Sequence, residues 1–282
     1  MKRTTIAFSL LLALPLAAAA QDAAPASADA SATAADSGGW AGSGEFGYAA
    51  SQGNSHSENL NAKLGLSKDD EVWRNNFFLT ALRAKGETTV TTLQNGQAVS
   101  EDRYSTTANR YDAGASLGYK YDPRAYVVGA LRYEHDDFAA NRWQAAASLG
   151  FGYIALKNGR TELSFEIAPG YKRYQPADYY VTDTGVTPPQ TLLVRPAAQG
   201  EPIVRGLANW KYRLTASTRF EDTVLVEAGT DNRYAQNDAG LAVSMTETLA
   251  LKLGYQVRYN SDTSPGTKST DQLWTTNLVY SF

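Results

Sequence analysis

The chain offers two histidines as candidate catalytic bases and no cysteine as a nucleophile. His56 lies in the segment Gly-Asn-Ser-His-Ser-Glu, so Ser55, Ser57 and Glu58 are its neighbours in one loop. A serine hydrolase brings its nucleophile, its base and an orienting group together from separate parts of the fold. Neighbours within a single loop do not offer that geometry, and we interpret His56 as a turn residue in solvent.

His135 is followed by Asp136 and Asp137 at the outer end of a predicted strand. Three interpretations are open: a solvated rim residue, a metal ligand together with the two aspartates, or a base. We favour the rim residue, because the chain lacks the spacing of zinc sites, the acidic calcium loop and the glycine-rich phosphate loop. The sequence therefore predicts a protein that is not an enzyme, with no metal and no cofactor.

Charged side chains form a second group of candidates, on the side of each predicted strand opposite the apolar residues. In a membrane barrel that side is the interior. The candidates for the lining are Glu45, Lys63, Arg132, Glu134, Glu162, Glu166, Lys172, Arg205, Lys211, Arg213, Glu227, Arg233, Lys252 and Arg258. Either opposite charges cross-link a narrow interior, or they line a water-filled pore and select ions. Because the signs are mixed, we favour the structural interpretation.

Alternation of apolar and polar residues indicates that these charges lie on β-strands. Between Leu249 and Tyr259, apolar and aromatic residues at odd positions oppose Lys252 and Arg258 at even positions. The fold class predicted is all-β, an up-and-down antiparallel transmembrane barrel of about twelve strands. We place the strands near residues 39–50, 59–67, 72–85, 104–120, 125–136, 141–156, 161–174, 204–216, 223–235, 238–246, 248–260 and 271–282.

The predicted connections alternate between short and long. Tight turns rich in Pro, Gly, Asn and Asp are expected at 67–70, 122–124, 157–160, 220–222 and 245–247. Between them come longer polar segments, notably 86–103 and 175–203. Short periplasmic turns and long external loops are typical of outer-membrane barrels. A soluble lipocalin-like barrel would show the same alternation, but neither this sorting of loops nor so many strands.

Aromatic residues near the ends of the apolar faces predict girdles at the two membrane interfaces. The candidates are Trp40, Tyr119, Trp143, Trp210, Tyr212, Tyr255 and Trp274. The last strand ends with Leu278, Tyr280 and Phe282 on one face. This ending is similar to the signal that bacterial barrel-assembly machinery recognises, and we expect that machinery to be a partner.

The N-terminal residues predict export. Lys2 and Arg3, the apolar run from Ile6 to Leu16 and the alanines at 18–20 have the pattern of a signal peptide, residues 1–20. Its removal moves the formal net charge from −3 to −5. Residues 21–38, rich in Ala and Ser, are predicted to be a disordered leader. The barrel then occupies 39–282. No apolar run is long enough for a membrane helix, no Cys follows for a lipid anchor, and no basic stripe indicates nucleic acid.

Three segments resemble the YdiY-like family, often labelled salt-induced outer-membrane proteins. They are the opening Trp-Ala-Gly-Ser-Gly-Glu at 40–45, the Gly-Asn-Ser-His-Ser loop at 53–57, and the closing hairpin from 249 to 282. The resemblance covers about 39–282, and the segment 175–203 looks like an insertion. It implies a β-barrel in the outer membrane of a Gram-negative bacterium and no defined reaction.

Three functions remain open after this comparison. The first is an envelope barrel with a structural or salt-stress role, the second a small-solute or ion channel, and the third an outer-membrane lipid hydrolase. The expected partners are outer-membrane lipids and lipopolysaccharide, with no nucleic acid. In the segment 175–203, Tyr179 and Tyr180 either contact sugars or a partner protein, as exposed loops on rigid scaffolds often do, or belong to a lid over the barrel mouth.

Overall fold

The computed structural model describes residues 39–51, 56–94, 97–183, 185, 190–263 and 268–282. The predicted signal peptide and leader at 1–38 therefore lie outside the described residues, as does Ser55 beside His56. Within the part that is described, no helix has the length and apolarity needed to cross a bilayer.

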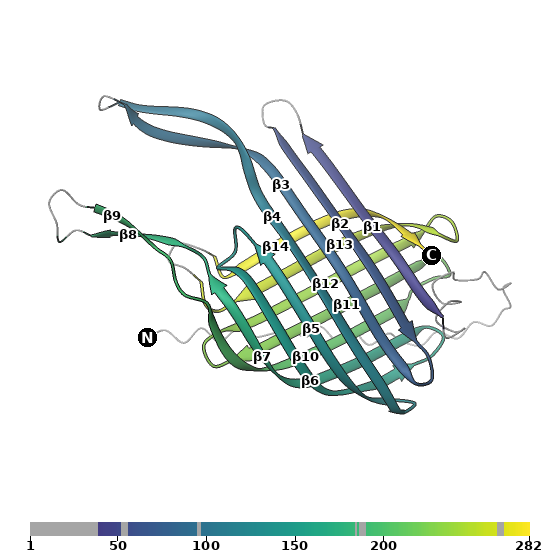
Figure 1. Cartoon of the computed structure of the whole chain (residues 1–282). Coiled ribbons are helices and arrows are strands. Elements are labelled where there is room, and N and C mark those ends of the chain that lie inside the picture. The colour runs from purple at the N-terminus through teal and green to yellow at the C-terminus, as the bar shows by residue number, and fades with distance from the viewer. Residues whose placement is uncertain (1–38, 52–55, 95–96, 184, 186–189, 264–267) are drawn as a thin grey trace, which may run out of the picture.

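Twelve antiparallel strands form one closed barrel, which confirms the predicted fold class (Figure 1). Around the barrel the strands follow the order β1-β14-β13-β12-β11-β10-β7-β6-β5-β4-β3-β2, and β8 and β9 form a separate two-stranded sheet. The strands are β1 (Trp40–Ser51), β2 (Ser57–Asp69), β3 (Trp73–Gln94), β4 (Gln97–Asp122), β5 (Ala125–Asp136), β6 (Asn141–Lys157), β7 (Thr161–Pro176), β8 (Tyr179–Asp183), β9 (Gln190–Val194), β10 (Gln199–Arg213), β11 (Thr218–Gly229), β12 (Arg233–Ser244), β13 (Leu249–Asn260) and β14 (Thr270–Ser281).

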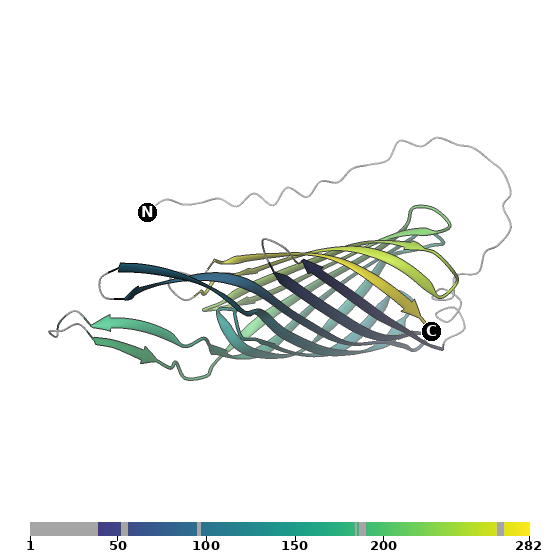
Figure 2. The same cartoon turned by 90° about the horizontal axis from the view of Figure 1, so that it is seen from above.

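The two ends of the barrel differ in their connections. The end at which β1 begins and β14 finishes, called the turn end here, has short turns at 70–72, 123–124, 158–160, 214–217 and 245–248. At the opposite end, the loop end, two ribbons project beyond the wall (Figures 1 and 2). One is formed by β3 and β4, which pair with each other as far as Gln94 and Gln97. The other is the β8–β9 sheet, which extends away from the barrel instead of covering its mouth (Figure 2).

Side chains alternate between the inside and the outside of this wall, as the sequence pattern requires. The outward Leu131, Leu149 and Ile167 are 62–64% exposed. On the inside, Tyr126, Val128 and Ile154 form a small buried apolar cluster. The wall is therefore apolar on its outer surface, and the interior is mostly polar.

Strand β3 has the least regular alternation, and a glycine on the neighbouring strand accommodates it. Phe77 and Phe78 are adjacent on β3, so one of the two rings must face inward. Phe78 is the inward one, because it lies on the same side of the strand as Thr80, whose hydroxyl donates to Asp112 inside the barrel. Phe78 lies over Gly114 of β4, where a Cβ would come within 2.2 Å of its ring. Glycine is needed at this position because only a missing side chain leaves room for the ring.

One predicted turn is wrong. A tight turn is predicted at 220–222 because Asp222 is a residue typical of turns, but residues 220–222 lie inside β11, and the chain turns at 214–217 instead. Phe220 packs edge-on against Trp210, with ring centroids 5.4 Å apart, and Glu221 pairs with Lys252. The charged residues that suggested a turn are thus ordinary members of a strand with one polar side.

Candidate functional site

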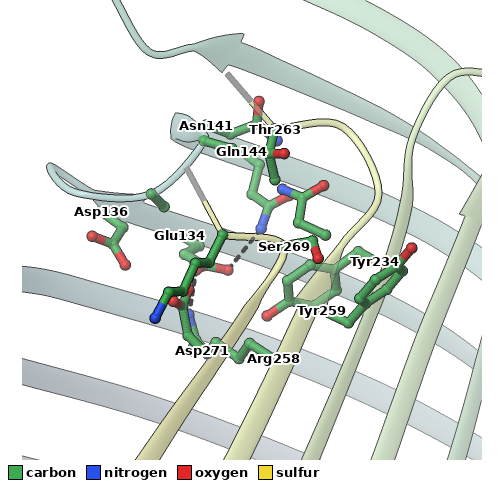
Figure 3. A pocket seen from close by; sticks show the side chains of 14 residues that line it. Glu134, Asp136, Asn141, Gln144, Tyr234, Arg258, Tyr259, Thr263, Ser269 and Asp271 are labelled. Carbon is green, nitrogen blue, oxygen red and sulfur yellow. Dashed lines mark hydrogen bonds and ion pairs between the residues drawn. The ribbon is translucent and has the colours of Figure 1, made fainter. Parts of the chain in front are cut away.

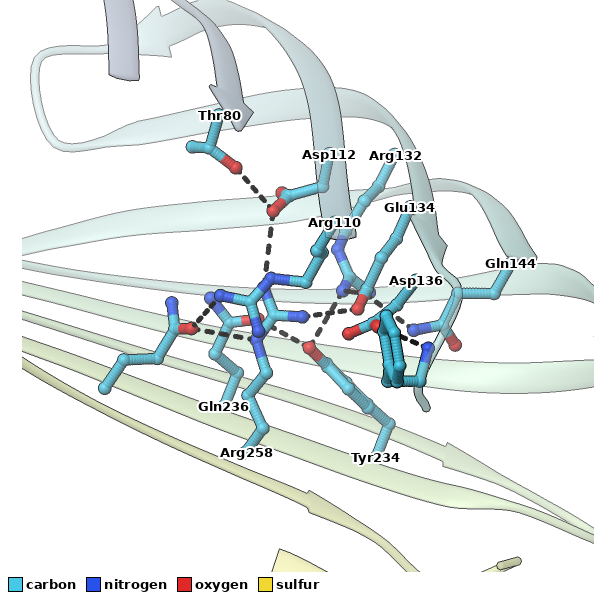
Figure 4. A network of polar contacts seen from close by, with 12 residues as sticks. Thr80, Arg110, Asp112, Arg132, Glu134, Asp136, Gln144, Tyr234, Gln236 and Arg258 are labelled. Carbon is cyan, nitrogen blue, oxygen red and sulfur yellow. Dashed lines mark hydrogen bonds and ion pairs between the residues drawn. The ribbon is translucent and has the colours of Figure 1, made fainter. Parts of the chain in front are cut away.

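Near the loop end, charged side chains from opposite sides of the barrel meet in its interior (Figure 4). We call this cluster the cross-barrel bridge; it consists of Asp112, Arg132, Glu134, Glu227, Tyr234 and Arg258. Strand β5, which positions Arg132 and Glu134, and strand β13, which positions Arg258, are six strands apart in either direction around the barrel. The bridge therefore spans the full width of the interior.

Arg258 makes the longest connection. Its Nη1 donates to Oε1 of Glu134, and its Nη2 lies 3.3 Å from Oδ2 of Asp112 on β4. Its Nε donates to the amide oxygen of Gln256 on its own strand, at 3.0 Å. Because all three guanidinium nitrogens have acceptors, the side chain is held in one orientation.

Arg132 makes a second connection, from β5 to β11 and β12. Its Nη1 lies 3.3 Å from Oε1 of Glu227, and its Nη2 donates to the Tyr234 hydroxyl at 2.9 Å and to Glu134. The guanidinium also lies over the Tyr234 ring, 4.6 Å from its centroid. Glu134 is thus shared by the two arginines and also accepts from the Gln144 amide at 2.7 Å.

These charges are buried, and each of the three carboxylates contacts at least one of the two arginines. Glu227, Asp112, Glu134 and Arg258 are 1%, 4%, 4% and 6% exposed. Isolated charges in such a place would be very costly, whereas paired and hydrogen-bonded charges are tolerated. In the bridge, each carboxylate contacts an arginine, and the side chains meet across the interior of the barrel.

A small polar cavity lies beside the bridge, between β5, β6, β13 and the residues Thr263, Lys268 and Ser269 (Figure 3). Glu134, Gln144 and Arg258 form its floor and Asn141 lies in its wall. The Asn141 Nδ2 and Gln144 Oε1 atoms are buried without a protein partner. A donor and an acceptor that face a polar space suit ordered water.

Closer to the turn end, further pairs join strands that are not neighbours. Lys252 lies 2.9 Å from Glu45 and 3.4 Å from Glu221. Arg74 reaches from β3 to Glu162 on β7, at 2.6 Å. These pairs therefore tie strands together along the inner wall, over two to four strands.

The structure places the predicted lining residues as follows. Thirteen of the fourteen lie at inward positions: Arg132, Glu134, Glu227 and Arg258 in the bridge; Glu45 with Lys252; Glu162 with Arg74; Glu166 with Arg205 at 2.8 Å; Lys172 with Glu201 at 3.6 Å; and Lys63, Lys211 and Arg213, which are more exposed. The sequence pattern thus found most of the charges but not which of them meet.

Arg233 is the exception, and its predicted inward position is wrong. Glu227 and Gly229 face inward at odd positions of β11, and the prediction continued that alternation through Arg233. The turn at 230–232 reverses the phase, so Tyr234 is 3% exposed on the inside of β12 and Arg233 lies on the outside, exposed. A three-residue turn with its own hydrogen bond, from Gly229 N–H to Asn232 C=O, cannot be detected by alternation alone.

Besides Glu221, which the predicted turn concealed, two residues of the interior were missed by sequence reasoning. Tyr234 was missed for the phase reversal just described. Glu201 was assigned to the long loop, but it opens the inner face of β10, 2% exposed, and accepts from the backbone N–H of Asp231 at 2.8 Å. Alternation of Glu201, Ile203 and Arg205 is the signal that would have found it.

The predicted girdle residues all lie on the outer surface. Trp40, Tyr119 and Trp210 are near the turn end and Trp143 is near the loop end, and Tyr212 packs near Trp210. Tyr255 and Trp274 are different, because they face each other about halfway along β13 and β14, with centroids 4.2 Å apart. Leu278, Tyr280 and Phe282 are exposed on the outer face of the last strand.

Neither histidine lies in the bridge. His56 is exposed beside Glu87, with Nδ1 3.4 Å from Oε2. His135 stacks on Tyr111 on the outside of the barrel and lies 2.9 Å from Oδ1 of Asp137. Among the described residues, no group of three or more acidic, histidine or cysteine side chains is arranged to hold a metal ion.

Comparisons with known proteins give a family and a set of distant barrels. The family model described as "Protein of unknown function, DUF481" matches residues 44–282. The translocator domain of the autotransporter NalP from Neisseria meningitidis is 11% identical, with a TM-score of 0.43, and the match covers 90% of this chain and 92% of that one. The KdgM porin is 9% identical, with a TM-score of 0.38 and coverage of 86% and 99%. Likeness at this level says nothing about function. No curated protein matches the sequence.

Proposed function

Because the chain belongs to the DUF481 family of proteins of unknown function, its role has to be inferred from its own geometry, and we propose that it is an exported outer-membrane barrel, closed at rest, with a structural role in the envelope. The observation that supports this most directly is the contact of Arg258 with Glu134, two residues on strands from opposite sides of the barrel. An open pore would keep such side chains against its wall.

The outer surface supports the membrane location. Large apolar side chains such as Leu149, Phe151 and Ile167 are 61–64% exposed, and a contiguous apolar surface of this kind is unfavourable in water. Every barrel strand is paired on both sides, which is what the interior of a bilayer demands of backbone groups. The wall thus fits lipid, with the charges enclosed.

Planar-bilayer recording tests the closed state. The wild-type protein is expected to give no stable conductance steps, whereas Arg132→Ala/Glu134→Ala/Arg258→Ala should conduct, because the side chains that cross the interior are removed. The matched control is Arg233→Ala, an exposed arginine near the same end but on the outside, which should stay silent. Equal conductance of the wild type and the triple variant would contradict a closure made by the bridge.

We propose no catalytic role for either histidine. The support is their separation from the interior and the outward stacking of His135 on Tyr111. In a lipid-release assay with reconstituted protein, the wild type, His56→Ala and His135→Ala should all remain at background. Release by the wild type that disappears in one variant would overturn this proposal in favour of a hydrolase.

The resemblance noted from the sequence extends the proposal to adaptation to salt. A deletion strain should grow less well than its parent in high salt, and wild-type protein supplied from a plasmid should restore growth. Equal growth of the deletion strain and its parent would contradict the adaptive role, and it would leave the barrel and its closed interior untouched.

For partners, we propose lipopolysaccharide at the loop end and the barrel-assembly machinery at the last strand. Tyr180, 73% exposed on the projecting β8–β9 sheet, is placed where it can contact sugars. Replacing Tyr180 by Ser should weaken retention of the folded protein on immobilised lipopolysaccharide, and unchanged retention would argue against this contact.

A further inference from the structure

Arginines on the outer wall of the barrel gather at one end. Near the loop end, outward strand positions carry four exposed arginines: Arg83 on β3, Arg142 on β6, Arg173 on β7 and Arg233 on β12. Near the turn end, the outward strand positions of the described residues carry a single basic side chain, Lys68, and its Nζ lies 2.9 Å from Oδ2 of Asp70. The positive charge of the outer wall is therefore concentrated at the end that has the long loops.

Two of these arginines, Arg142 and Arg173, lie near each other on neighbouring strands. The residues that flank Arg173, Lys172 and Tyr174, are buried inside the barrel, so Arg173 faces outward, where it is exposed. Arg142 is exposed at a bulge near the start of β6, where β6 has one residue more than β7. Both guanidinium groups are thus accessible from outside the barrel.

The acidic side chain beside Arg142 is already engaged by other partners. Oδ2 of Asp137 accepts from Nδ2 of Asn109 at 2.6 Å, and Oδ1 lies 2.9 Å from Nε2 of His135. These two hydrogen bonds, and to a smaller extent the charges of His135 and Arg142, lower the pKa of Asp137. Among the residues that the structure describes, neither Arg142 nor Arg173 has a hydrogen bond or an ion pair of its guanidinium group.

The arginines inside the barrel show the opposite behaviour. Each member of the inner set contacts a carboxylate of the chain itself: Arg74, Arg132, Arg205 and Arg258. An outward arginine that the chain leaves unpaired can take its anion from the surroundings. The planar guanidinium presents its N–H groups as a fork, and this fork matches the oxygens of a phosphate group better than an ammonium does.

An aromatic ring sets the height of the two arginines in the membrane. In the register of β6 and β7, Trp143 is opposite Gln175 and Ala145 is opposite Arg173. Arg173 is therefore a diagonal neighbour of Trp143, at about 7–8 Å between Cα atoms, and Arg142 directly precedes Trp143. Because tryptophan favours the interface between acyl chains and headgroups, the two guanidinium groups lie at the level of lipid phosphates.

We propose that Arg142 and Arg173 form a binding site on the outer wall for the phosphate groups of lipopolysaccharide. Basic side chains at the membrane surface are the usual partners of anionic headgroups. Lipopolysaccharide fits better than phospholipid, because it makes up the external leaflet, and the outward arginines are found at the end with the long external loops. The inference rests on the proposed outer-membrane location, and it adds a charged contact to the sugar contact proposed for Tyr180.

Native mass spectrometry of the folded protein in detergent tests the site, with lipid A, the phosphorylated anchor of lipopolysaccharide, as the probe. The wild type should retain lipid A and should lose it when the phosphates are removed from the probe. Arg142→Gln and Arg173→Gln should each weaken binding about tenfold, since each removes charge-assisted hydrogen bonds, and Arg142→Gln/Arg173→Gln should weaken it further. Heat-modifiable migration on a gel verifies that each variant is folded.

The matched control is Arg233→Gln, which removes an exposed arginine at the same end. Among the described residues, the strands beside it, β11 and β13, carry no outward arginine, so lipid A binding should be unchanged. Should the double variant not fold, Arg173→Lys, which keeps the charge and lacks the fork, should still weaken binding.

Three results would overturn the proposal: equal retention of lipid A by the wild type and the variants at 142 and 173, equal retention of the dephosphorylated probe, or an equal loss with Arg233→Gln. Retention of phosphatidylglycerol as strong as that of lipid A would overturn the choice of lipopolysaccharide. A wild type that fails to enter lipid vesicles would instead overturn the membrane location.

Discussion

At the scale of single residues, the interior is organised by pairs of opposite charge held away from water. Lys172 and Glu201 are 0% and 2% exposed, with Nζ and Oε1 3.6 Å apart. The second oxygen of Glu201 accepts from the backbone of the β11–β12 turn. Removing one member of such a pair leaves the other charge buried without a partner. The resulting loss of folding free energy exceeds what the pair itself contributes to stability.

Arg258→Met is therefore expected to destabilise the barrel by about 3–5 kcal/mol, because Glu134 and Asp112 keep their burial and lose a shared partner. Unfolding in urea from lipid vesicles measures the change. Arg233→Met is the control; it is exposed on the outside and should stay within about 0.5 kcal/mol of the wild type. Similar losses of unfolding free energy in both variants would show that Arg258 contributes no more to stability than an exposed arginine does.

Gly114→Ala tests the close approach of Phe78. The added Cβ would lie 2.2 Å from the ring, and relief of that overlap should cost about 1–3 kcal/mol. Gly44→Ala is the matched change, since nothing lies within 4 Å of its added Cβ. The same urea measurement compares them, and equal stability would mean that Phe78 moves aside freely.

At the scale of elements, short turns fix the pairing of neighbouring strands. In the β2–β3 turn, Oδ1 of Asp70 accepts from the backbone N–H groups of Trp73 and Val72, at 2.6 and 2.8 Å. The bond from Trp73, together with Lys68 and the bond from Val72, lowers the pKa of Asp70 to about 2. The folded turn thus stabilises the charged form of the Asp70 carboxyl.

The stability that Asp70 contributes should be complete at neutral pH and lost as pH falls. A folded-state pKa below the unfolded value of about 3.9 means that protonation favours unfolding, so the loss runs from about pH 4 to below pH 2. The difference in unfolding free energy between the wild type and Asp70→Ala should shrink over that range. Asp70→Asn keeps the acceptor without the charge, and a difference from Asp70→Ala that changes with pH would contradict this explanation.

At the scale of the whole molecule, the barrel is closed by its first and last strands. The N–H of Gly42 donates to the carbonyl of Phe282 at 2.7 Å, and the N–H of Phe282 donates back at 2.9 Å. The Phe282 ring covers Gly42, whose added Cβ would lie 2.2 Å from it. Phe282, the last residue of the sequence, thus helps to close the sheet between β14 and β1.

Deleting Phe282 should therefore reduce the folded, heat-modifiable fraction of the protein in the outer membrane, since two closing hydrogen bonds and the aromatic ending are lost together. Phe282→Tyr keeps both and serves as the control. Refolding of the purified deletion variant into vesicles separates the two causes: normal refolding there with poor assembly in cells indicates lost recognition, whereas normal assembly in both settings would contradict either role.

The class of fold follows from the amino-acid sequence alone. Alternation reports which side of a strand a residue faces, and it is a local property, so the twelve strands, the apolar outer wall and most inward charges could be predicted. It fails where the phase changes within a few residues, and this is why Arg233 is predicted inside and Tyr234 is missed. The turn predicted at 220–222 is a separate error, because a turn-type residue there belongs to a continuous strand.

Which charges meet depends on the folded barrel as a whole. Arg258 and Glu134 are separated by 124 positions in the chain, and their contact depends on strand number, stagger and closure, which together bring β13 opposite β5. No local pattern contains that information, because the width of a barrel is a property of all its strands at once. The pairing of the enclosed charges, on which the proposed closed state rests, therefore depends on the closure of the whole sheet.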